Sequence, residues 1–445
     1  MKRIICLILS AILLLCLCGC NNEDNDVSSV PIDIEYQEII VDESGNTIIS
    51  SDLPTVSDEQ PLDNQASDVQ SIVSDNGSLD TESNGIIIDY DTVVEVDICD
   101  DVIRAYLDAT DPRQQYAFLS QYSESVLDYQ NLPLRWKPDG SSTYTLYISE
   151  KSDFSDAYTT KVNGTYDEGY YVSGKTEAIC VPGKTYYWKV LGQYNDRARG
   201  GGKIRIKDTP VRWVKLDGVV NVRDIGGWKT ESGKAVSYEK IYRGGQLDKI
   251  SNTGIDTLKA LGIKTDVDVR STASWDSHSP VERTGLEYYF LDTHYTYESM
   301  LSEYYASAVS KNYQQLFALL SDESNYPFYI HCGAGTDRTG ATMFILNGLL
   351  GVSYEDLTRD YELTSFATAD RWRGNGTGGT FMPDDLIHEN VSNSEIDATW
   401  GVLNKTFMES DYCTDGKLST AIENFLLARG VKQEHIDAYK NIMLK

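Results

Sequence analysis

A stretch in the last third of this 445-residue chain sets a cysteine before small residues and an arginine. The segment FYIHCGAGTDRTG, residues 328–340, places Cys332 directly after an apolar run and Arg338 six positions later. The three small residues that follow the cysteine leave room for backbone N–H groups to turn inward around an anion. Because an arginine guanidinium donates two parallel hydrogen bonds to a phosphate group, the segment offers a nucleophile beside an anion site.

A helix is predicted directly after this stretch, and it would favour both the nucleophile and the anion site. It is expected to begin near Arg338 or Thr339, and the free N–H groups at a helix N-terminus stabilise negative charge. The same field favours the thiolate form of Cys332, which is the nucleophilic form. The residues therefore predict attack of a thiolate on a bound phosphate group, with a phosphocysteine as the intermediate. A buried structural cysteine in a glycine-rich turn is the alternative interpretation.

The complete loop resembles the signature of the protein tyrosine phosphatase superfamily. It has the Cys-x5-Arg spacing, with His331 before the cysteine and Thr339-Gly340 after the arginine, features that rhodanese-like loops lack. The resemblance implies that Cys332 is the nucleophile, that Arg338 binds phosphate oxygens, and that Thr339 donates to the departing sulfur. It gives His331 a role in ordering the loop and assisting thiolate formation, while a buried core histidine is the alternative. The resemblance also implies substrate binding by Gly333, Ala334, Gly335, Thr336 and Gly340.

A second set of motifs narrows the resemblance to the atypical bacterial tyrosine and lipid phosphatases. The motifs are GVVNVRDIGG at 218–227, IYRGGQL at 241–247 and VDVRS at 267–271, and the resemblance covers roughly residues 214–445. Where that group commonly has a lysine, this chain has Thr336, which removes a positive charge beside the site and disfavours phosphoinositides. We expect a turn with a structural ion pair that braces the phosphate site, formed by Asn221, Arg223 and Asp224.

Two aspartates are candidates for the general acid that must protonate the leaving oxygen. Asp337 lies within the loop, and the family resemblance assigns the role to this position; a helix cap is its alternative function. Asp292, forty residues before the cysteine, is the second candidate. The sequence MPDDL at 382–386 mimics an acid loop but follows the cysteine, so we discount it. A glycine-rich segment is either a substrate-contacting lid or a solvated loop, and it begins with Arg371, Trp372 and Arg373.

Strands and helices alternate from about residue 214, a pattern typical of an α/β fold with a largely parallel sheet flanked by helices. Such sheets bind ligands at the carboxyl ends of their strands, which is where a strand at 328–332 would deliver Cys332. The other strand is predicted at 263–270. Helices are predicted at 251–262, 339–351 and 418–430, and are ended by Gly262, Gly351 and Gly430.

Residues 108–213 predict an all-β domain. Aromatic and β-branched residues alternate with polar ones at 132–138, 144–150, 170–181, 185–194 and 202–207. This number of short strands suggests a β-sandwich, and the details resemble a fibronectin type III module. In that resemblance Trp136 lies on an early strand, Tyr186 takes the tyrosine-corner place, and Cys180 is a buried thiol. The sequence does not indicate what this domain binds.

The first twenty residues have the features of a bacterial lipoprotein signal. Lys2 and Arg3 precede an apolar run at 4–17, which is shorter than a typical membrane span. The following Leu-Cys-Gly-Cys resembles a lipobox and implies cleavage before Cys20 and lipidation of its thiol. The protein is then expected on the extracytoplasmic face of a cell membrane, held by its lipid anchor. A plain signal peptide and a retained membrane helix are the alternatives.

Residues 21–107 predict a disordered acidic tether. Of the chain's net charge of −29, most comes from residues 21–100, which hold 21 Asp or Glu and no Lys or Arg. Such a composition buries too little apolar surface to offset chain entropy. The acidity argues against nucleic-acid binding, which requires a basic surface. No CxxC pair or His/Cys cluster indicates a metal, and we expect no cofactor.

These features predict a cysteine-dependent phosphomonoester hydrolase, most simply a protein tyrosine phosphatase, that acts on phosphorylated proteins or small phosphoesters. One alternative is a phosphatase of inositol phosphates or phosphoinositides; the enzymes of small soluble esters share the Cys-x5-Arg spacing but not the Asn-x-Arg-Asp-x-Gly-Gly segment. Another is a surface adhesion lipoprotein with an inactive phosphatase fold. The intact Cys332, Asp337 and Arg338 speak against the latter.

Overall fold

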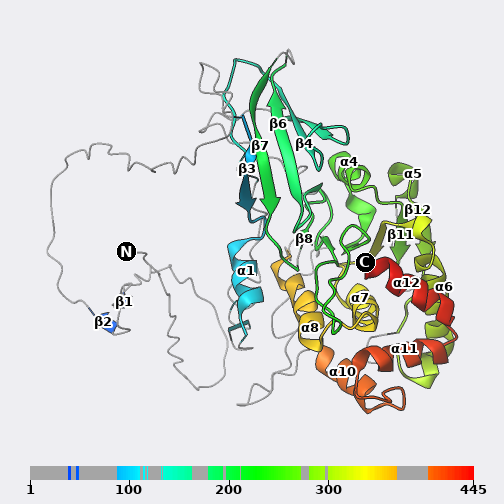
Figure 1. Cartoon of the computed structure of the whole chain (residues 1–445). Coiled ribbons are helices and arrows are strands. Elements are labelled where there is room, and N and C mark those ends of the chain that lie inside the picture. The colour runs from blue at the N-terminus through cyan, green and yellow to red at the C-terminus, as the bar shows by residue number, and fades with distance from the viewer. Residues whose placement is uncertain are drawn as a thin grey trace, which may run out of the picture. The chain divides into compact units, whose positions relative to one another are not determined.

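The computed structural model describes residues 39–41, 47–49 and 88–444, apart from gaps at 111–113, 116–117, 119–131, 133, 163–178, 194–196, 211, 272–279, 296–298 and 368–398. The chain forms two compact units, Met1–Asp75 and Asn76–Lys445. In the first unit, β1 (Ile39–Val41) pairs antiparallel with β2 (Thr47–Ile49) (Figure 1). No helix within the described residues is both long and apolar enough to cross a bilayer.

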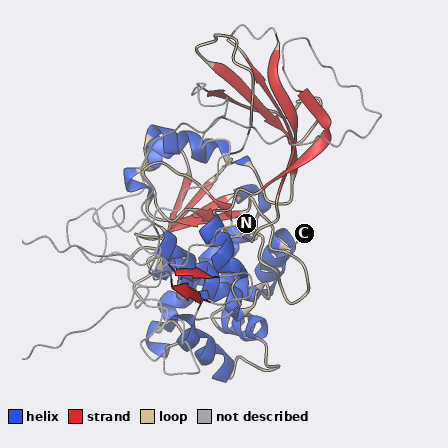
Figure 2. Cartoon of the chain, turned by 90° about the vertical axis from the view of Figure 1, so that its left-hand side faces the viewer, coloured by secondary structure: helices blue, strands red, loops and turns tan. Residues whose placement is uncertain are grey.

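A six-stranded sheet forms the centre of the region from residue 212 onward, in the order β12-β11-β13-β10-β9-β8. The neighbours among β10, β11, β12 and β13 are parallel, whereas β8 and β9 join antiparallel. Figure 2 shows these strands lying among helices. The predicted α/β class with a largely parallel sheet is therefore confirmed. The strands are β8 (Arg212–Trp213), β9 (Arg223–Asp224), β10 (Ile241–Gly244), β11 (Thr265–Asp268), β12 (Glu287–Phe290) and β13 (Phe328–His331).

All three predicted helices of this region are confirmed, each ending close to its predicted glycine. Gly262, Gly351 and Gly430 have φ of 67°, 86° and 81°, the left-handed conformation that ends a helix and that glycine adopts without strain. The α-helices are α4 (Asn252–Ala260), α5 (Val281–Thr284), α6 (Ala306–Leu320), α7 (Asp337–Leu349), α8 (Tyr354–Glu362), α10 (Thr399–Glu409), α11 (Leu418–Ala428) and α12 (Gln433–Met443). Short 3-10 turns are η1 (Leu247–Lys249), η3 (Glu303–Tyr305), η4 (Glu323–Asn325) and η5 (Leu363–Phe366).

The alternation of side chains along β13 separates two helical layers. Phe328 and Ile330 are buried in a cluster with residues of α6, α7, α8, α10, α11 and α12, whereas Tyr329 is buried with residues of α4. Helix α7 is central to the first layer, because every residue from Thr339 to Leu349 is buried. A helix that is buried on all sides fixes the position of the loop at its N-terminus, which here is the cysteine loop.

A second, five-stranded sheet, here called the β-module, has the order β3-β7-β6-β4-β5. The predictions of strands at 144–150, 185–194 and 202–207 are confirmed. At 132–138 the described residues form only an isolated bridge at Arg135 and no full strand, with Leu134 and Trp136 buried. Most of the strand predicted at 170–181 lies outside the described residues. The strands are β3 (Ile88–Val96), β4 (Tyr144–Ser149), β5 (Tyr158–Val162), β6 (Thr185–Leu191) and β7 (Ala198–Ile206).

The β-module shows one sheet within its described residues, so the sandwich and the fibronectin-like identity stay predictions. The hydroxyl of Tyr186 accepts from the Val181 N–H at 3.0 Å and donates to the Ile179 carbonyl at 3.4 Å. These contacts reach back to the preceding backbone, as in a tyrosine corner. Cys180 is fully buried in this module, and Cys99, Cys332 and Cys413 form no disulfide within the described part of the chain.

The boundary of the acidic tether needs correction. Residues 21–107 were predicted to be disordered, yet they include β1, β2, β3 and all but the last residue of α1 (Asp101–Asp108). The acidic composition made these elements hard to recognise in the sequence. Acidic residues occur among the Ile and Val residues of β3 and flank the apolar side of α1. The sequence of β3 is IDYDTVVEV and that of α1 is DVIRAYLD. Ile103 and Tyr106 of α1 are buried against the helical layer that contains α7.

Candidate active site

Cys332 occupies the position that the sequence predicted, immediately after β13 at the carboxyl edge of the parallel sheet. The strand lies between β10 and β11, so both neighbours end beside the cysteine. Five residues later α7 begins at Asp337. The side chain of Cys332 is 3% exposed, and Gly333 beside it is more accessible. The cysteine therefore lies at the base of a loop that connects a central strand to the N-terminus of a buried helix.

The carbonyl groups of this loop are held by hydrogen bonds on one side. The Asn221 amide donates to the carbonyls of Ala334 at 3.1 Å and Gly335 at 3.2 Å, and the Arg243 guanidinium donates to Gly335 at 2.7 Å. The Gln246 backbone N–H donates to the Gly333 carbonyl at 2.9 Å. In a trans peptide the N–H points opposite to the C=O. The next N–H groups in the loop are thus directed to the other side, where they can donate to an anion.

Gly335 is required at its position in the loop for two independent reasons. Its φ is 73°, which side-chain-bearing residues rarely adopt. A Cβ atom there would lie 2.3 Å from the Gly244 carbonyl group. Strand β10 can therefore pass this close to the loop only because residue 335 has no side chain. This explains why the sequence pattern has a glycine there.

Asp360 organises the arginines beneath the loop. Its carboxylate contacts Arg223 at 3.0 Å and also pairs with Arg243, and all three residues are buried. Burial raises the pKa of the Asp360 carboxyl, but the two guanidinium groups outweigh it and hold the pKa below its ordinary value. Arg223 also donates to the Asn221 side-chain oxygen, which directs the Asn221 amide to the loop. Two buried guanidinium groups share the one Asp360 carboxylate, and these charge-assisted contacts hold both arginines in place beneath the loop.

Of the three predicted supporting residues, Asn221 contacts the loop directly and Arg223 contacts it through Asn221, and the ion pairing differs from that expected. Arg223 and Asp224 point to separate partners: Arg223 pairs with Asp360, and Asp224 pairs with Arg212 at 2.9 Å. Arg212, Arg243 and Asp360 were not predicted as site residues. The YRG motif contains Arg243 and is the one available signal, whereas Asp360 lies in an ordinary helical sequence.

His331 is fully buried and contacts an acceptor at each ring nitrogen. Its Nε2 lies 3.0 Å from Asp266 Oδ1, and its Nδ1 lies 3.1 Å from the Cys332 carbonyl. Burial alone would lower the pKa of His331, but the carboxylates of Asp266 and Asp268 and the Cys332 carbonyl raise it to about 9. The imidazolium is the form that makes an ion pair with Asp266 and can donate to the Cys332 carbonyl. A positive charge is therefore buried directly behind the cysteine.

The two candidate acids lie in different surroundings. Asp337 is exposed at the first position of α7 and accepts a hydrogen bond from the Tyr361 hydroxyl at 3.0 Å. Asp292 follows β12 by two residues, and the parallel register of β12, β11 and β13 places it at the same sheet edge as Cys332. One strand, β11, lies between the strands that Asp292 and Cys332 follow, whereas Asp337 belongs to the cysteine loop itself.

The remaining loop residues differ in exposure. Thr336 is 2% exposed, so position 336 faces the interior and not an open edge of the site as its comparison with a lysine suggested. Thr339 is fully buried, and its hydroxyl has no hydrogen-bond partner within the described part of the chain. Arg338 is partly buried and its Nη1 lies 3.4 Å from the Ser271 hydroxyl, which belongs to the predicted VDVRS motif. Gly340 packs against the ring of Tyr361, with no room for a Cβ.

Several predicted features lie outside the described residues: the segment with Arg371, Trp372 and Arg373, the sequence at 382–386, and the signal sequence with Cys20. No cluster of three or more His, Cys, Asp or Glu side chains that could hold a metal ion occurs among the residues that are described.

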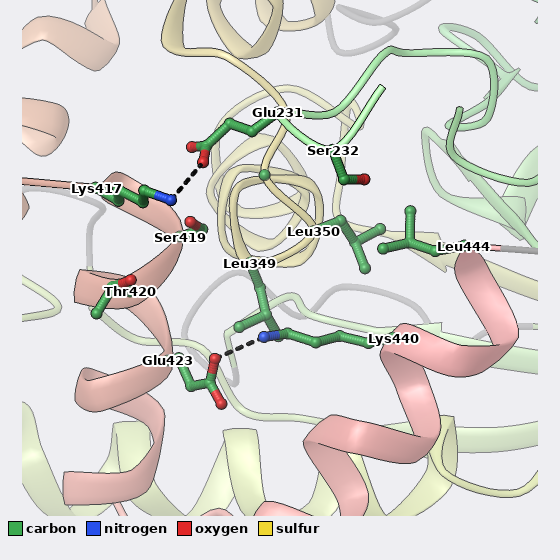
Figure 3. Close-up of a pocket in the computed structure, with 11 residues that line it drawn as sticks. Glu231, Ser232, Leu349, Leu350, Lys417, Ser419, Thr420, Glu423, Lys440 and Leu444 are labelled. Atoms are coloured by element: carbon green, nitrogen blue, oxygen red, sulfur yellow. Dashed lines mark hydrogen bonds and ion pairs between the residues drawn. The ribbon is translucent and has the colours of Figure 1, made fainter. Parts of the chain in front are cut away.

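A separate cavity lies at the opposite end of α7, beside Leu349 and Leu350 (Figure 3). Its charged side chains are paired, with Lys417 3.8 Å from Glu231 and Lys440 2.6 Å from Glu423. A helix of 13 residues is roughly 20 Å long, so this cavity is distant from the cysteine loop. It is not part of the anion site.

A parallel sheet that delivers a cysteine into an amide-lined loop ending in arginine and a buried helix is the arrangement of a phosphate-binding enzyme site. Residues 214–445, just over half of the chain, match the family model described as "Tyrosine phosphatase family". The chain belongs to this family and is an enzyme of the protein-tyrosine-phosphatase class.

Individual relatives are distant. A Cupriavidus necator protein classed as a tyrosine-protein phosphatase is 25% identical over 221 residues, which cover 42% of this chain and 80% of that protein. A tyrosine-protein phosphatase of Nostoc commune is 26% identical over 148 residues, which cover 29% of this chain and 50% of the relative. Among solved structures, the core catalytic domain of the PP-IP phosphatase SIW14 from S. cerevisiae, in complex with citrate, is 18% identical with a TM-score of 0.22; the match covers 29% of this chain and 73% of that domain.

Proposed function

We propose that this protein hydrolyses phosphomonoesters of tyrosine in proteins through a phosphocysteine intermediate. The observation that carries the proposal is the orientation of the cysteine loop. Hydrogen bonds from Asn221, Arg243 and Gln246 hold the carbonyls of three successive loop residues away from the anion side. The N–H groups so directed, together with Arg338 and the N-terminus of α7, form a site for the three equatorial oxygens of a phosphoryl group.

In the first step the Cys332 thiolate attacks phosphorus in line with the leaving oxygen. An S–P bond forms, the P–O bond to the tyrosine oxygen breaks, and Asp337 transfers its proton to that oxygen. The buried imidazolium of His331 favours the thiolate by its charge, and its bond to the Cys332 carbonyl fixes the start of the loop. Arg338 and the loop amides stabilise the charge on the transferred group throughout.

In the second step water attacks the phosphocysteine. The carboxylate of Asp337 accepts a proton from the water, an O–P bond forms, and the S–P bond breaks with return of the thiolate. The buried hydroxyl of Thr339, which lacks a partner among the described residues, is available to donate to the departing sulfur. Inorganic phosphate leaves, and the starting state is restored.

A phosphotyrosine substrate is preferred over a phosphoinositide in this proposal. A single phosphoryl group needs only the loop amides, Arg338 and the helix N-terminus. Each additional phosphate requires a nearby cation, and residues 333–337 of the loop contain none.

The test of the proposed function is replacement of the nucleophile. Cys332→Ser is expected to abolish hydrolysis of p-nitrophenyl phosphate and of a phosphotyrosine peptide, because serine lacks a thiolate. The variant should retain the fold and the binding of orthovanadate or inorganic phosphate. Undiminished turnover in Cys332→Ser, or turnover that requires an added divalent metal, would contradict the mechanism. A phosphoinositide turned over faster than the peptide would contradict the substrate class.

We further propose that the enzyme is lipid-anchored at Cys20 on the extracytoplasmic face of a cell membrane, with the β-module as a fibronectin-like spacer or binding domain. The proposal rests on the resemblance of residues 17–20 to a lipobox. Cys20→Ala should abolish incorporation of labelled fatty acid and release the protein from the membrane or leave an unprocessed precursor. Recovery of the unaltered protein wholly in the cytosol would contradict it.

A further inference from the structure

Helix α1 precedes the family-matched region by more than a hundred residues, yet it packs on that region. Its Tyr106 is fully buried, and its ring meets Phe366 edge-on at 5.4 Å between centroids. The Tyr106 hydroxyl donates to Glu362 Oε2 at 2.6 Å. Figure 1 shows α1 beside α8, the helix that ends at Glu362. The contact joins two residues that are 256 positions apart in the sequence.

The segment that Tyr106 holds contains three residues in contact with the site. Asp360 pairs with Arg243, which in turn donates to the Gly335 carbonyl. Tyr361 donates to Asp337 at 3.0 Å. Thr364 accepts from the Asn221 amide at 3.3 Å. Residues 360–364 therefore support the anion loop from two directions and also contact the candidate acid.

We propose that Tyr106 is a positioning residue of the active site: by holding Glu362 it fixes segment 360–364, and through it Asp337 and the anion loop. The inference rests on the proposed function, and it extends the catalytic unit beyond residues 214–445 to include α1. Because α1 follows β3 directly in the chain, the β-module and the catalytic loop are joined through this helix.

The strength of this connection follows from the burial of both partners. Burial raises the pKa of the Glu362 carboxyl to about 7, while the Tyr106 hydroxyl and the charge of Arg359 oppose the increase. Removal of the hydroxyl leaves a buried carboxyl without this donor, which is costly in a protein interior. The segment around Glu362 is then expected to shift until the carboxyl finds another donor or water. A shift of this segment moves the Tyr361 hydroxyl relative to Asp337.

The experiment compares Tyr106→Phe with Tyr439→Phe in the full-length protein. Tyr439 of α12 is also fully buried with an edge-on ring contact, to Phe317, but its hydroxyl has no hydrogen-bond partner among the described residues. Both variants keep the ring and lose one buried hydroxyl. The measurements are kcat and KM for p-nitrophenyl phosphate, a good leaving group, and for phenyl phosphate, a poor one.

Tyr106→Phe is expected to reduce kcat for phenyl phosphate about ten-fold and kcat for p-nitrophenyl phosphate by about three-fold or less, because only the poor leaving group depends strongly on the acid. Tyr439→Phe should leave both values unchanged. A loss of folded protein would reduce both rates equally, so an equal reduction, or none, overturns the proposal.

Binding of orthovanadate, followed by calorimetry, separates this inference from the proposed function. Tyr106→Phe should raise the Kd for orthovanadate about three-fold or more, since Arg243 and Asn221 lose part of their fixed geometry, and Tyr439→Phe should not. If the unaltered protein binds orthovanadate but hydrolyses neither ester, the proposed function fails. The coupling of Tyr106 to the loop is then judged by the Kd alone, and an unchanged Kd in Tyr106→Phe overturns it.

Discussion

The Nε2 atom of His331 lies 3.0 Å from Oδ1 of Asp266, and neither side chain is exposed to solvent. The two residues come from adjacent parallel strands, β13 and β11, on the face that also carries Asp268. Because the opposite ring nitrogen meets the Cys332 carbonyl, this pair connects the centre of the sheet to the first peptide of the anion loop. Within this pair, the imidazolium of His331 is a fixed positive charge in a place that water does not reach.

The pair predicts a specific dependence on pH. The pKa of His331 is raised to about 9, from an ordinary value near 6.5. A raised pKa means that the folded state binds the proton more tightly, so its contribution to stability is complete below about pH 6.5 and is lost as the pH rises through about 9. The unaltered enzyme should therefore keep its charged His331 at neutral pH and lose stability and activity at alkaline pH.

Asp266→Asn tests this expectation. Removal of the carboxylate should lower the pKa of His331 by more than one unit and move the alkaline limb of the kcat profile to lower pH. It should also cost about 3 kcal/mol of unfolding free energy, since one member of a buried pair is lost. NMR titration of the imidazole and urea unfolding measure both effects. Asp156→Asn, which removes an exposed carboxylate in the β-module, is the control and should change neither. An unchanged imidazole titration would contradict the assigned charge.

The second prediction distinguishes the two candidate acids. Asp337→Asn should slow hydrolysis of phenyl phosphate by on the order of 100-fold and hydrolysis of p-nitrophenyl phosphate much less, because the amide cannot protonate a poor leaving group. Asp292→Asn, at the same sheet edge but two strands from Cys332, is the matched control and should show no such dependence on the leaving group. The reverse pattern would assign the acid to Asp292.

Local signals explain which parts of this structure the sequence could predict. Cys332, Arg338 and Gly335 lie within seven residues, and the strand and helix on either side have clear patterns and a glycine stop. The network that supports the loop gives no such local signal, because its partners are far apart in the sequence. Asp360 meets Arg223 across 137 positions and Tyr106 meets Glu362 across 256, so no sequence window contains both partners. Helix α1 was missed because the acidic composition around it outweighed its short amphipathic pattern.

The third prediction concerns the buried carboxyl of Glu362. Its pKa is raised to about 7 from 4.5, so the protonated form is favoured in the folded state. The stability due to this proton is complete below about pH 4.5 and is lost as the pH rises through about 7. Glu362→Gln mimics the protonated form and can still accept from Tyr106. It should match the unaltered protein at pH 4.5 and exceed it at pH 8 by on the order of 2–3 kcal/mol.

Urea unfolding at the two pH values measures this difference. Glu434→Gln, which changes an exposed carboxylate on α12, provides the control and should give the same small effect at both. A stability difference between Glu362→Gln and the unaltered protein that does not depend on pH would show that Glu362 titrates normally in the folded state.

The last prediction concerns Gly335, where backbone conformation and space both exclude a side chain. In Gly335→Ala a methyl group would meet the Gly244 carbonyl group at 2.3 Å and would stand on a backbone with φ of 73°. The loop must move away from β10 to relieve this contact, which takes the Gly335 carbonyl from Arg243 and turns the neighbouring N–H groups out of the anion site. We expect a loss of kcat/KM on the order of 100-fold and of orthovanadate binding by a similar factor.

Gly140→Ala is the control, because residue 140 has a similar φ of 84° but open space around the added methyl group. This variant isolates the conformational cost of about 1–2 kcal/mol and should leave activity unchanged. Gly335→Ala with full activity would show that the loop amides do not need the support of β10 to hold the phosphoryl group.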